Sequence, residues 1–245
     1  YNRDTAANKA DVRSLSETAA ISDGLFGDLT FFLKSEVLSS CCKPEGDDTM
    51  KVVAFNGSPR KDGNTAILIE ATLQVLRQEG IETEHISLAG QHLNGCVACY
   101  RCFKEKGQCH QKDDAVNEYI RKISEAQGVI LASPVYFADV TANMKALMER
   151  SGMVARAAGD IFRRKVGAAI VAVRRAGAIH TFDSLNHYFS IGQMIVVGSS
   201  YWNVGRGLQP GDVSGDEEGI RTMQTLGENM AWVIKKLYGN ESVGT

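Results

Sequence analysis

The sequence predicts an α/β protein built on a five-stranded parallel sheet with helices on both faces. Continuous apolar segments, typical of strands that are buried on both faces, recur along the chain from residue 50 onward. Amphipathic segments with helical periodicity lie between them, so that strand and helix alternate five times. A crossover helix is the usual connection between neighbouring parallel strands, and the alternation therefore favours a parallel sheet over an antiparallel one.

The chain of 245 residues is long enough for one large domain with an appendage. Its composition is that of a globular protein, with 44% hydrophobic and 23% charged residues and a formal net charge of −2. A charge so close to neutral gives no electrostatic reason to expect a nucleic-acid partner. The sequence has no run of eighteen apolar residues, and we expect no membrane span.

The first 48 residues differ from the rest. Small, apolar and charged residues alternate there in a loosely helical pattern, and "CCKPEGDD" (41–48) has the composition of a linker. We therefore expect a helical N-terminal extension over 1–48, followed by the main domain over 49–245. The alternative for the extension is a poorly ordered leader.

The first elements of the main domain are a buried strand and a helix. "KVVAFNGSP" (51–59) is an apolar run that ends in turn residues, and an amphipathic helix over 64–79 follows it and is closed by Gly80. "IETEHISL" (81–88) alternates like a more peripheral strand. A cysteine-rich loop over 94–112 comes next.

The remaining elements complete the alternating pattern. In order, we expect a helix over 113–126, a strand over 128–137, a helix over 140–152, a strand over 165–173, a helix over 181–192, a strand over 194–200 and a terminal helix over 217–239. Five parallel strands favour the order 2-1-3-4-5, which is called flavodoxin-like. Ligands of such sheets bind beyond the carboxyl ends of the strands, here in the loops that start near Asn56, Ser133 and Arg174.

The turn "NGSPRKDGNTA" (56–66) joins the first strand to the first helix. Its polar side chains and the free N–H groups at the start of the helix can bind a terminal phosphate monoester. The turn lacks the Gly-Lys-Ser/Thr of a P-loop and the Gly-x-Gly-x-x-Gly of a dinucleotide site. "GRGLQPG" (205–211) resembles the latter only superficially. An ordinary glycine-rich turn with a capping residue explains the spacing equally well.

Three segments, namely "GSPRKDGNT", "SPVYFADVTANMKALMER" and the cysteine-rich loop, resemble the NADPH-dependent FMN reductase family. The resemblance covers roughly residues 50–240 and is closest to the iron–sulfur flavoprotein branch. It implies FMN as cofactor, with its phosphate held by Ser58, Arg60, Asn64 and Thr65. It also implies that the flavin ring and ribityl chain are held by Pro134, Val135, Tyr136, Phe137, Gly177 and Arg174 or Arg175.

One segment departs from that family. Members often have Lys-x-x-x-Asp-Arg in the helix after "PVYF", whereas this chain has Lys145 followed by Glu149 and Arg150. We expect this change to affect only a contact between subunits.

Four of the six cysteines lie within fourteen residues, as Cys96, Cys99, Cys102 and Cys109. The compact spacing is similar to ferredoxin-type ligation, in which one short loop surrounds a four-iron cluster. A structural zinc site, or free redox-active thiols beside FMN, are alternatives. The clustering of cysteines in one loop of a long chain favours a reducing, cytoplasmic setting over a disulfide-bonded secreted domain.

We therefore expect a cytoplasmic FMN-dependent oxidoreductase that transfers electrons between FMN and a 4Fe–4S cluster. The alternatives are a cluster-free NAD(P)H-dependent FMN or quinone reductase, and an FMN electron carrier without a substrate of its own. The resemblance implies NAD(P)H as donor, although the sequence shows no nicotinamide site and ferredoxin suits equally well. We expect a small-molecule or protein electron partner and a homodimer or homotetramer.

Overall fold

The computed structural model describes residues 49–239, which form a sheet enclosed by helices. The extension expected over 1–48 lies outside the described residues. The strands are β1 (Lys51–Asn56), β2 (Glu82–Ser87), β3 (Gly128–Pro134), β4 (Val166–Val173), β5 (Ile195–Val196) and β6 (Val204–Arg206). The helices are α1 (Asn64–Gln78), α2 (Val116–Glu125), α3 (Ala142–Ala157), α4 (Ala178–Ile191) and α5 (Glu217–Tyr238), with short 3₁₀ helices at Arg101–Phe103 and Asp212–Gly215.

The strand order β2-β1-β3-β4-β5 confirms the predicted topology, and all the strand pairings are parallel. The fifth position of the sheet differs from the prediction of one strand over 194–200. Strand β5 pairs only with the start of β4, where Val166 lies opposite Ile195. The chain then leaves the sheet and returns as β6 beside the end of β4, where Val171 lies opposite Val204. The segment GSSYWN (198–203) lies between these two pairings and includes Tyr201 and Trp202, which are common in strands, so its composition does not predict the interruption.

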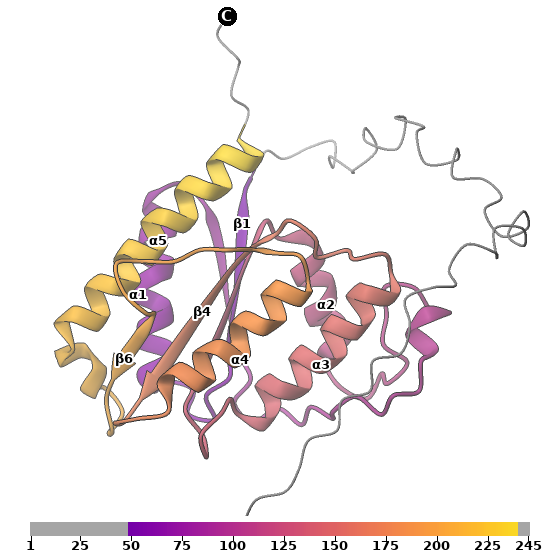
Figure 1. The fold of residues 1–245 in the computed structure, drawn as a ribbon, viewed down its shortest axis with the longest axis horizontal. Coiled ribbons are helices and arrows are strands. Elements are labelled where there is room, and N and C mark those ends of the chain that lie inside the picture. Colours follow the sequence, from indigo (N-terminus) through magenta and orange to yellow (C-terminus); the bar gives the residue numbers. More distant parts are fainter. Residues whose placement is uncertain (1–48, 240–245) are drawn as a thin grey trace, which may run out of the picture. The chain divides into compact units, whose positions relative to one another are not determined.

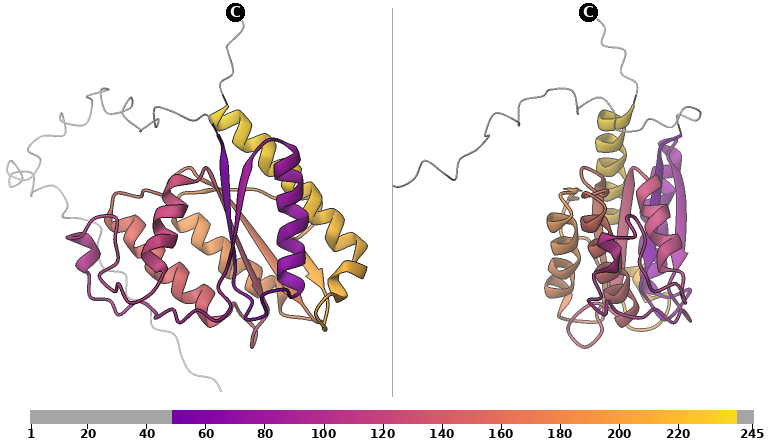
Figure 2. Two further views of the ribbon diagram at one scale, coloured as in Figure 1. Left: turned by 180° about the vertical axis from the view of Figure 1, so that it is seen from behind. Right: turned by 90° about the vertical axis from the view of Figure 1, so that its right-hand side faces the viewer.

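Helices cover both faces of the sheet (Figures 1 and 2). Alternate strand residues point to opposite faces, so the apolar strands supply two separate cores. Val53 and Phe55 of β1 belong to the core beneath α2, α3 and α4, whereas Val52 and Ala54 belong to the core beneath α1 and α5. All four side chains are fully buried, as the continuous apolar run of this strand predicts.

The register of the strands aligns their carboxyl ends at one edge of the sheet, toward the bottom of Figure 1. Asn56 lies opposite Ala132, and Val173 lies opposite Arg206. The segments that follow β1, β3, β4 and β6 therefore emerge side by side. The sequence predicts a ligand site from the first three of these segments, and the structure adds the segment after β6.

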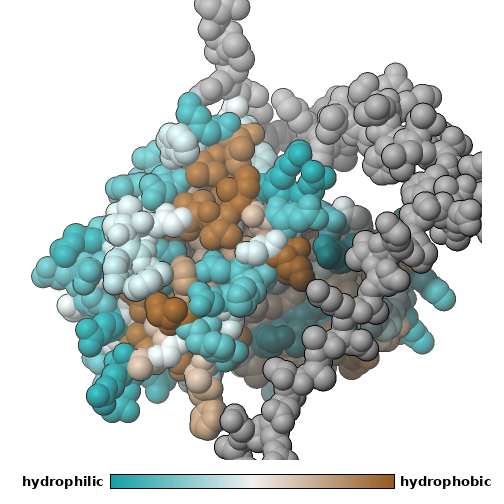
Figure 3. Space-filling model, in the orientation of Figure 1, coloured by the Kyte–Doolittle hydropathy of each residue, from teal (hydrophilic) through white to brown (hydrophobic). Residues whose placement is uncertain are grey.

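The surface of the described residues is mixed in character. On the face drawn in Figure 3, hydrophobic areas lie among hydrophilic ones. The exposed large apolar side chains of the described residues include Ile191, Val196 and Leu237. Within residues 49–239, none of the helices combines the length and the apolarity that crossing a membrane requires.

Candidate functional site

A cavity of about 170 Å³ opens at the carboxyl edge of the sheet. Four segments that are distant in the sequence contribute its walls. They are the turn before α1, the end of β3, the end of β4 and the chain after β6. The cavity is lined by Ser58, Arg60, Gly63, Asn64, Thr65, Pro134, Val135, Tyr136, Ala172, Arg174, Gly207 and Leu208. Eight of the ten predicted cofactor-binding residues are among them, whereas Phe137 and Gly177 are not.

The turn between β1 and α1 is held by its own side chains. Asn56 Oδ1 accepts a hydrogen bond of 3.0 Å from the backbone N–H of Ser58, and Ser58 Oγ accepts one of 3.1 Å from that of Arg60. Helix α1 begins after Gly63, which provides no side-chain cap. The N–H groups of Ala66 and Ile67 donate to the carbonyl of Gly63 at 3.0 and 3.4 Å. The N–H groups at the first two positions of a helix have no carbonyl within the helix to donate to, so those of Asn64 and Thr65 are available to an anion at this end of the cavity.

Asn64 lines the cavity, but its side chain is engaged in a contact that the sequence did not indicate. Its Nδ2 donates to the carbonyl of Gln209 at 2.9 Å, and its Oδ1 accepts from the N–H groups of Gly211 and Val213 at 3.0 and 3.3 Å. The side chain therefore fastens the segment after β6 to the start of α1. This role differs from the direct phosphate contact expected for Asn64.

The end of β3 leads into a tight turn with unusual backbone angles. Tyr136 and Asp139 form an isolated antiparallel bridge, and between them Phe137 and Ala138 have φ values of 45° and 76°. Residues other than glycine rarely adopt such backbone angles, and the cases that occur are concentrated at functional sites. The Phe137 side chain is fully exposed, outside the cavity in which it was expected. Beyond the turn, Asp139 lies 3.7 Å from His180 in the first turn of α4.

Arg174 and Gly177 follow β4, and the structure separates their roles. Arg174 lines the cavity, whereas its neighbour Arg175 does not. Gly177 precedes α4 with a φ of 90°, and a Cβ atom there would lie 3.1 Å from Cγ1 of Val135. Gly177 thus allows the start of α4 to pack closely behind the β3 turn, and it acts on the cavity through Val135.

The sequence reasoning missed the segment after β6. Gly207 and Leu208 line the cavity, within the stretch "GRGLQPG" that resembled a dinucleotide motif only superficially. A Cβ atom on Gly207 would lie 2.7 Å from Nδ2 of Asn64 and 2.9 Å from the backbone nitrogen of Val213. The close approach requires a glycine, and the density of glycine in this stretch was the one signal that pointed to it.

The four clustered cysteines line a second, smaller cavity of about 20 Å³. Cys102 and Cys109 are buried, whereas Cys96 and Cys99 are exposed. Burial raises the pKa of the Cys102 thiol, which favours its protonated form in the absence of a metal. The remaining wall of the cavity is formed by Val97, Ala98, Tyr100, His110, Gln111, Arg150, Met153 and Val154.

The cysteine-rich loop is anchored to helices α2 and α3. Asn117 of α2 accepts a hydrogen bond of 2.7 Å from the N–H of Cys109 and donates one of 3.0 Å to its carbonyl. Glu149 of α3 accepts a hydrogen bond of 3.2 Å from the N–H of Cys96. Arg150 lies beneath the loop and contacts it at several points. Glu149 and Arg150 thus bind this loop of their own chain, in addition to any contact between subunits.

In the described part of the chain, no three His, Cys, Asp or Glu side chains are grouped so that they could hold one metal ion. The four cysteines nevertheless share one cavity. A four-iron cluster bonds each thiolate to a different iron atom, so its ligands need not converge on one point as the ligands of zinc do. The chemistry of the donor set fits a cluster better than a single ion.

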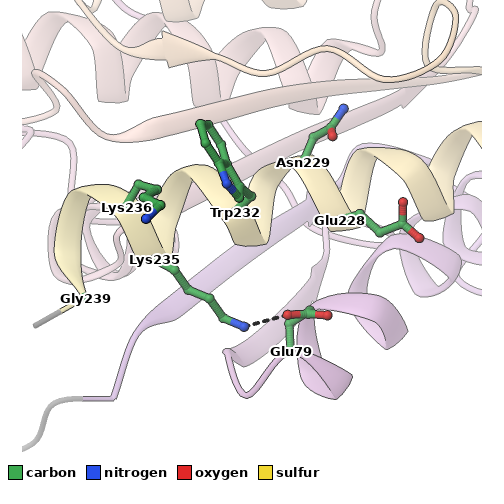
Figure 4. A pocket seen from close by; sticks show the side chains of 7 residues that line it. All are labelled: Glu79, Glu228, Asn229, Trp232, Lys235, Lys236 and Gly239. Atoms are coloured by element: carbon green, nitrogen blue, oxygen red, sulfur yellow. Dashed lines mark hydrogen bonds and ion pairs between the residues drawn. The ribbon is translucent and has the colours of Figure 1, made fainter. Parts of the chain in front are cut away.

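Two further pockets are present, and the second shares Met153 with the wall of the cysteine cavity. One, of about 610 Å³, is located between the carboxyl-terminal ends of α1 and α5, where Lys235 pairs with Glu79 at 2.5 Å beside Trp232 (Figure 4). It is open and lined mainly by charged side chains. The other, of about 270 Å³, is a groove between α3 and α4 whose lining includes Met148, Met153 and Ile191.

Known proteins are similar to this chain in sequence and in fold. A profile of the family described as NADPH-dependent FMN reductase matches residues 50–209. The chain is 44% identical over 193 residues to an iron–sulfur flavoprotein of Methanocaldococcus jannaschii, which covers 76% of this chain and 98% of that protein. An iron–sulfur flavoprotein of Archaeoglobus fulgidus is 34% identical over 193 residues, which are 78% of this chain and 84% of that protein. The structure of a flavodoxin, WrbA-like protein from Agrobacterium tumefaciens superposes with a TM-score of 0.55 at 12% identity, covering 77% of this chain and 98% of that one.

Proposed function

Because this chain belongs to the NADPH-dependent FMN reductase family of flavin-dependent oxidoreductases, we propose that it transfers electrons between FMN and an iron–sulfur cluster. FMN would occupy the cavity at the carboxyl edge, and the cluster would be held by the four cysteines of residues 96–109. One observation carries this proposal. Residues from three separate loops that the family resemblance assigns to FMN line one cavity, and the four cysteines line another.

The hydrogen-bond donors of the cavity at the carboxyl edge match the phosphate group of FMN. Arg60 provides a fixed positive charge, Ser58 a hydroxyl, and the uncapped start of α1 its backbone N–H groups. A phosphate monoester suits such a combination, because it offers several acceptor oxygens and a negative charge. Binding it there also excludes water from the first turn of α1, which strengthens each of these hydrogen bonds.

The side chains farther along the cavity would hold the ribityl chain and the flavin ring. Pro134, Val135 and Tyr136 provide the apolar wall that a flat aromatic ring requires. Arg174, at the end of β4, would stabilise negative charge on the reduced ring. FMN itself supplies the redox chemistry, in which two electrons are accepted together and released one at a time.

Two features of the cysteine cavity suit a cluster, namely its four thiols as ligands and the positive charge of Arg150 beside them. The Nε–H of Arg150 lies 3.3 Å from the sulfur of Cys109, as expected for a sulfur that carries negative charge. A bound cluster would supply one-electron transfer. The protein would hold it between a buried pair of cysteines and an exposed pair, with the exposed pair toward an electron partner.

The test is the quantification of FMN, iron and acid-labile sulfide in protein prepared without oxygen, together with its absorption spectrum. We expect one FMN and about four iron and four sulfide per chain. The variant Cys102→Ser should retain FMN and lose iron, and Arg60→Gln should lose FMN affinity and retain iron.

Other outcomes lead to the alternatives. Bound FMN without iron would contradict the cluster and favour a cluster-free NAD(P)H-dependent reductase, which is then assayed with NADPH, NADH and a quinone. Bound FMN and iron without oxidation of a pyridine nucleotide would favour a carrier that requires a protein partner. Zinc without flavin would contradict the whole proposal.

A further inference from the structure

Arg150 is a charged residue buried in the protein interior, at 1% exposure, and it ranks among the largest fully buried side chains of the described residues. It lies on α3 and faces the cysteine-rich loop. A buried guanidinium is stable only when its charge is paired and its N–H groups have acceptors. The hydrogen-bond partners of Arg150 therefore indicate the role of this buried charge.

Three of its contacts fasten the two ends of the loop. Nη1 donates to the carbonyl of Asn94, two residues before Cys96, at 3.2 Å. Nη2 donates to the carbonyl of Gln111, two residues after Cys109, at 2.8 Å. Nη1 also pairs with the buried carboxylate of Asp114. One rigid planar group thus fixes where the cysteine run begins and where it ends.

The fourth contact reaches a sulfur atom. Nε of Arg150 donates to Sγ of Cys109 at 3.3 Å. A buried ion pair that served only to fasten the loop would need the carbonyls and Asp114, but it would not need a donor directed at a thiol. Hydrogen bonds and positive charge at ligand sulfurs raise the reduction potential of a cluster, because they stabilise its more negative reduced state.

We propose that Arg150 is the positioning residue of the cluster site, which holds the loop closed around the four thiolates and sets the reduction potential of the cluster through Cys109. This inference rests on the proposed function. The fork geometry is specific to arginine, since a lysine keeps the charge but cannot direct four hydrogen bonds at fixed angles.

The experiment compares Arg150→Gln and Arg150→Lys with a matched control, Arg156→Gln. Arg156 is on the same helix but is exposed, and within residues 49–239 its side chain pairs with Asp160 at 3.5 Å. The readouts are FMN per chain, the rate of iron loss to a chelator, and the midpoint potential of the cluster from spectra recorded during a redox titration. The flavin of each variant serves as an internal reference.

We expect all three variants to keep FMN. In Arg150→Gln, iron loss should be about 10- to 100-fold faster and the midpoint potential should be more negative. The midpoint potential of Arg150→Lys should lie close to that of the unmodified chain, whereas its iron should be lost to the chelator almost as fast as in Arg150→Gln. If both Arg150 variants match Arg156→Gln in potential and in iron loss, the inference is wrong. If Arg150→Gln fails to fold, Arg150→Lys against the control decides by the same criterion.

A different result would contradict the proposed function while leaving the inference testable. If the unmodified chain binds FMN but no iron, no cluster exists, and the role in setting its potential is excluded. The positioning of the loop is then measured by hydrogen exchange of the backbone over 94–111 in the FMN-loaded chain. Exchange at least about tenfold faster in Arg150→Gln than in Arg156→Gln supports the positioning role, and equal rates overturn it.

Discussion

The carboxamide of Asn64, at the first position of α1, donates a hydrogen bond of 2.9 Å to the carbonyl oxygen of Gln209, which is 145 residues later in the chain. Its oxygen accepts from Gly211 and Val213 of the same segment. One side chain therefore connects the phosphate turn to the loop after β6. This connection closes the cavity on the side where the sequence predicted no wall.

Replacing Asn64 by Ala should release that loop and weaken FMN binding. Three hydrogen bonds at a half-buried position correspond to about 1–2 kcal/mol, or roughly a 5- to 30-fold higher dissociation constant. The measurement is fluorescence titration of FMN together with hydrogen exchange over 207–213. Gln74→Ala, at an exposed position of the same helix, is the control. Weaker binding with unchanged exchange would indicate that Asn64 contacts the phosphate directly instead.

A methyl group at Gly207 should displace the same loop by steric contact. The added Cβ would lie 2.7 Å from Nδ2 of Asn64 and 2.9 Å from the nitrogen of Val213, closer than unbonded atoms approach. We expect Gly207→Ala to lower FMN affinity and Gly198→Ala to leave it unchanged, because a Cβ at Gly198 meets nothing within 4 Å. Equal affinities of the two variants, measured by the same titration, would contradict the close packing described above.

Replacing Arg60 by Gln should weaken the binding of FMN but not of riboflavin, which has no phosphate. A hydrogen bond to a charged group contributes about 1.5–3 kcal/mol, so the dissociation constant of FMN should rise roughly 10- to 150-fold. Arg77→Gln, at the other end of α1 where Arg77 pairs with Glu70, is the control. A parallel loss of affinity for riboflavin would show that Arg60 acts on the shape of the site and not on the phosphate.

The buried pair of Asp114 and Arg150 should make stability depend on pH in the acid range. Burial opposes the ionisation of Asp114, but hydrogen bonds from Arg150 and from the N–H groups of Val116 and Asn94 outweigh it, so its pKa lies below the ordinary value of 3.8. The folded chain therefore binds this proton more weakly than the unfolded chain. The stabilisation is complete well above pH 4 and is lost as the pH falls through the lowered pKa.

Asp114→Asn tests that dependence. At neutral pH it should lose about 3–5 kcal/mol of unfolding free energy, because the buried charge of Arg150 remains without its partner. It should also lose less stability than the unmodified chain between pH 5 and pH 3 (roughly the range in which aspartates titrate). Urea unfolding across this range, with FMN and iron removed beforehand, measures both effects. The exposed Asp183→Asn is the control, and an identical acid dependence of all three proteins would contradict the assigned pKa.

The sequence by itself determined the sheet, its strand order and the edge at which the cavity of the candidate site opens. These features depend on local sequence patterns and on general rules of chain connection. Strands buried on both faces must be continuously apolar, as 52–55 is, and the crossover helices between them leave few topologies open. The residues at the carboxyl ends of β1, β3 and β4 then follow from chain order alone. Ser58, Arg60, Asn64, Thr65 and residues 134–136, which were predicted to contact FMN, accordingly line one cavity.

Tertiary structure alone decided the rest, because it depends on contacts between distant segments. No local pattern indicates that β5 stops at Val196 and that β6 resumes the sheet, since both depend on the fit against β4. No local sequence pattern predicts that the side chain of Asn64 bonds to a loop 145 residues later in the chain. The burial of Arg150 beneath the cysteines is of the same kind. The helical pattern of the sequence would place Arg150 on the surface as an exposed charge. Only the packing of α3 against the cysteine-rich loop provides the hydrogen-bond acceptors that allow its guanidinium to be buried.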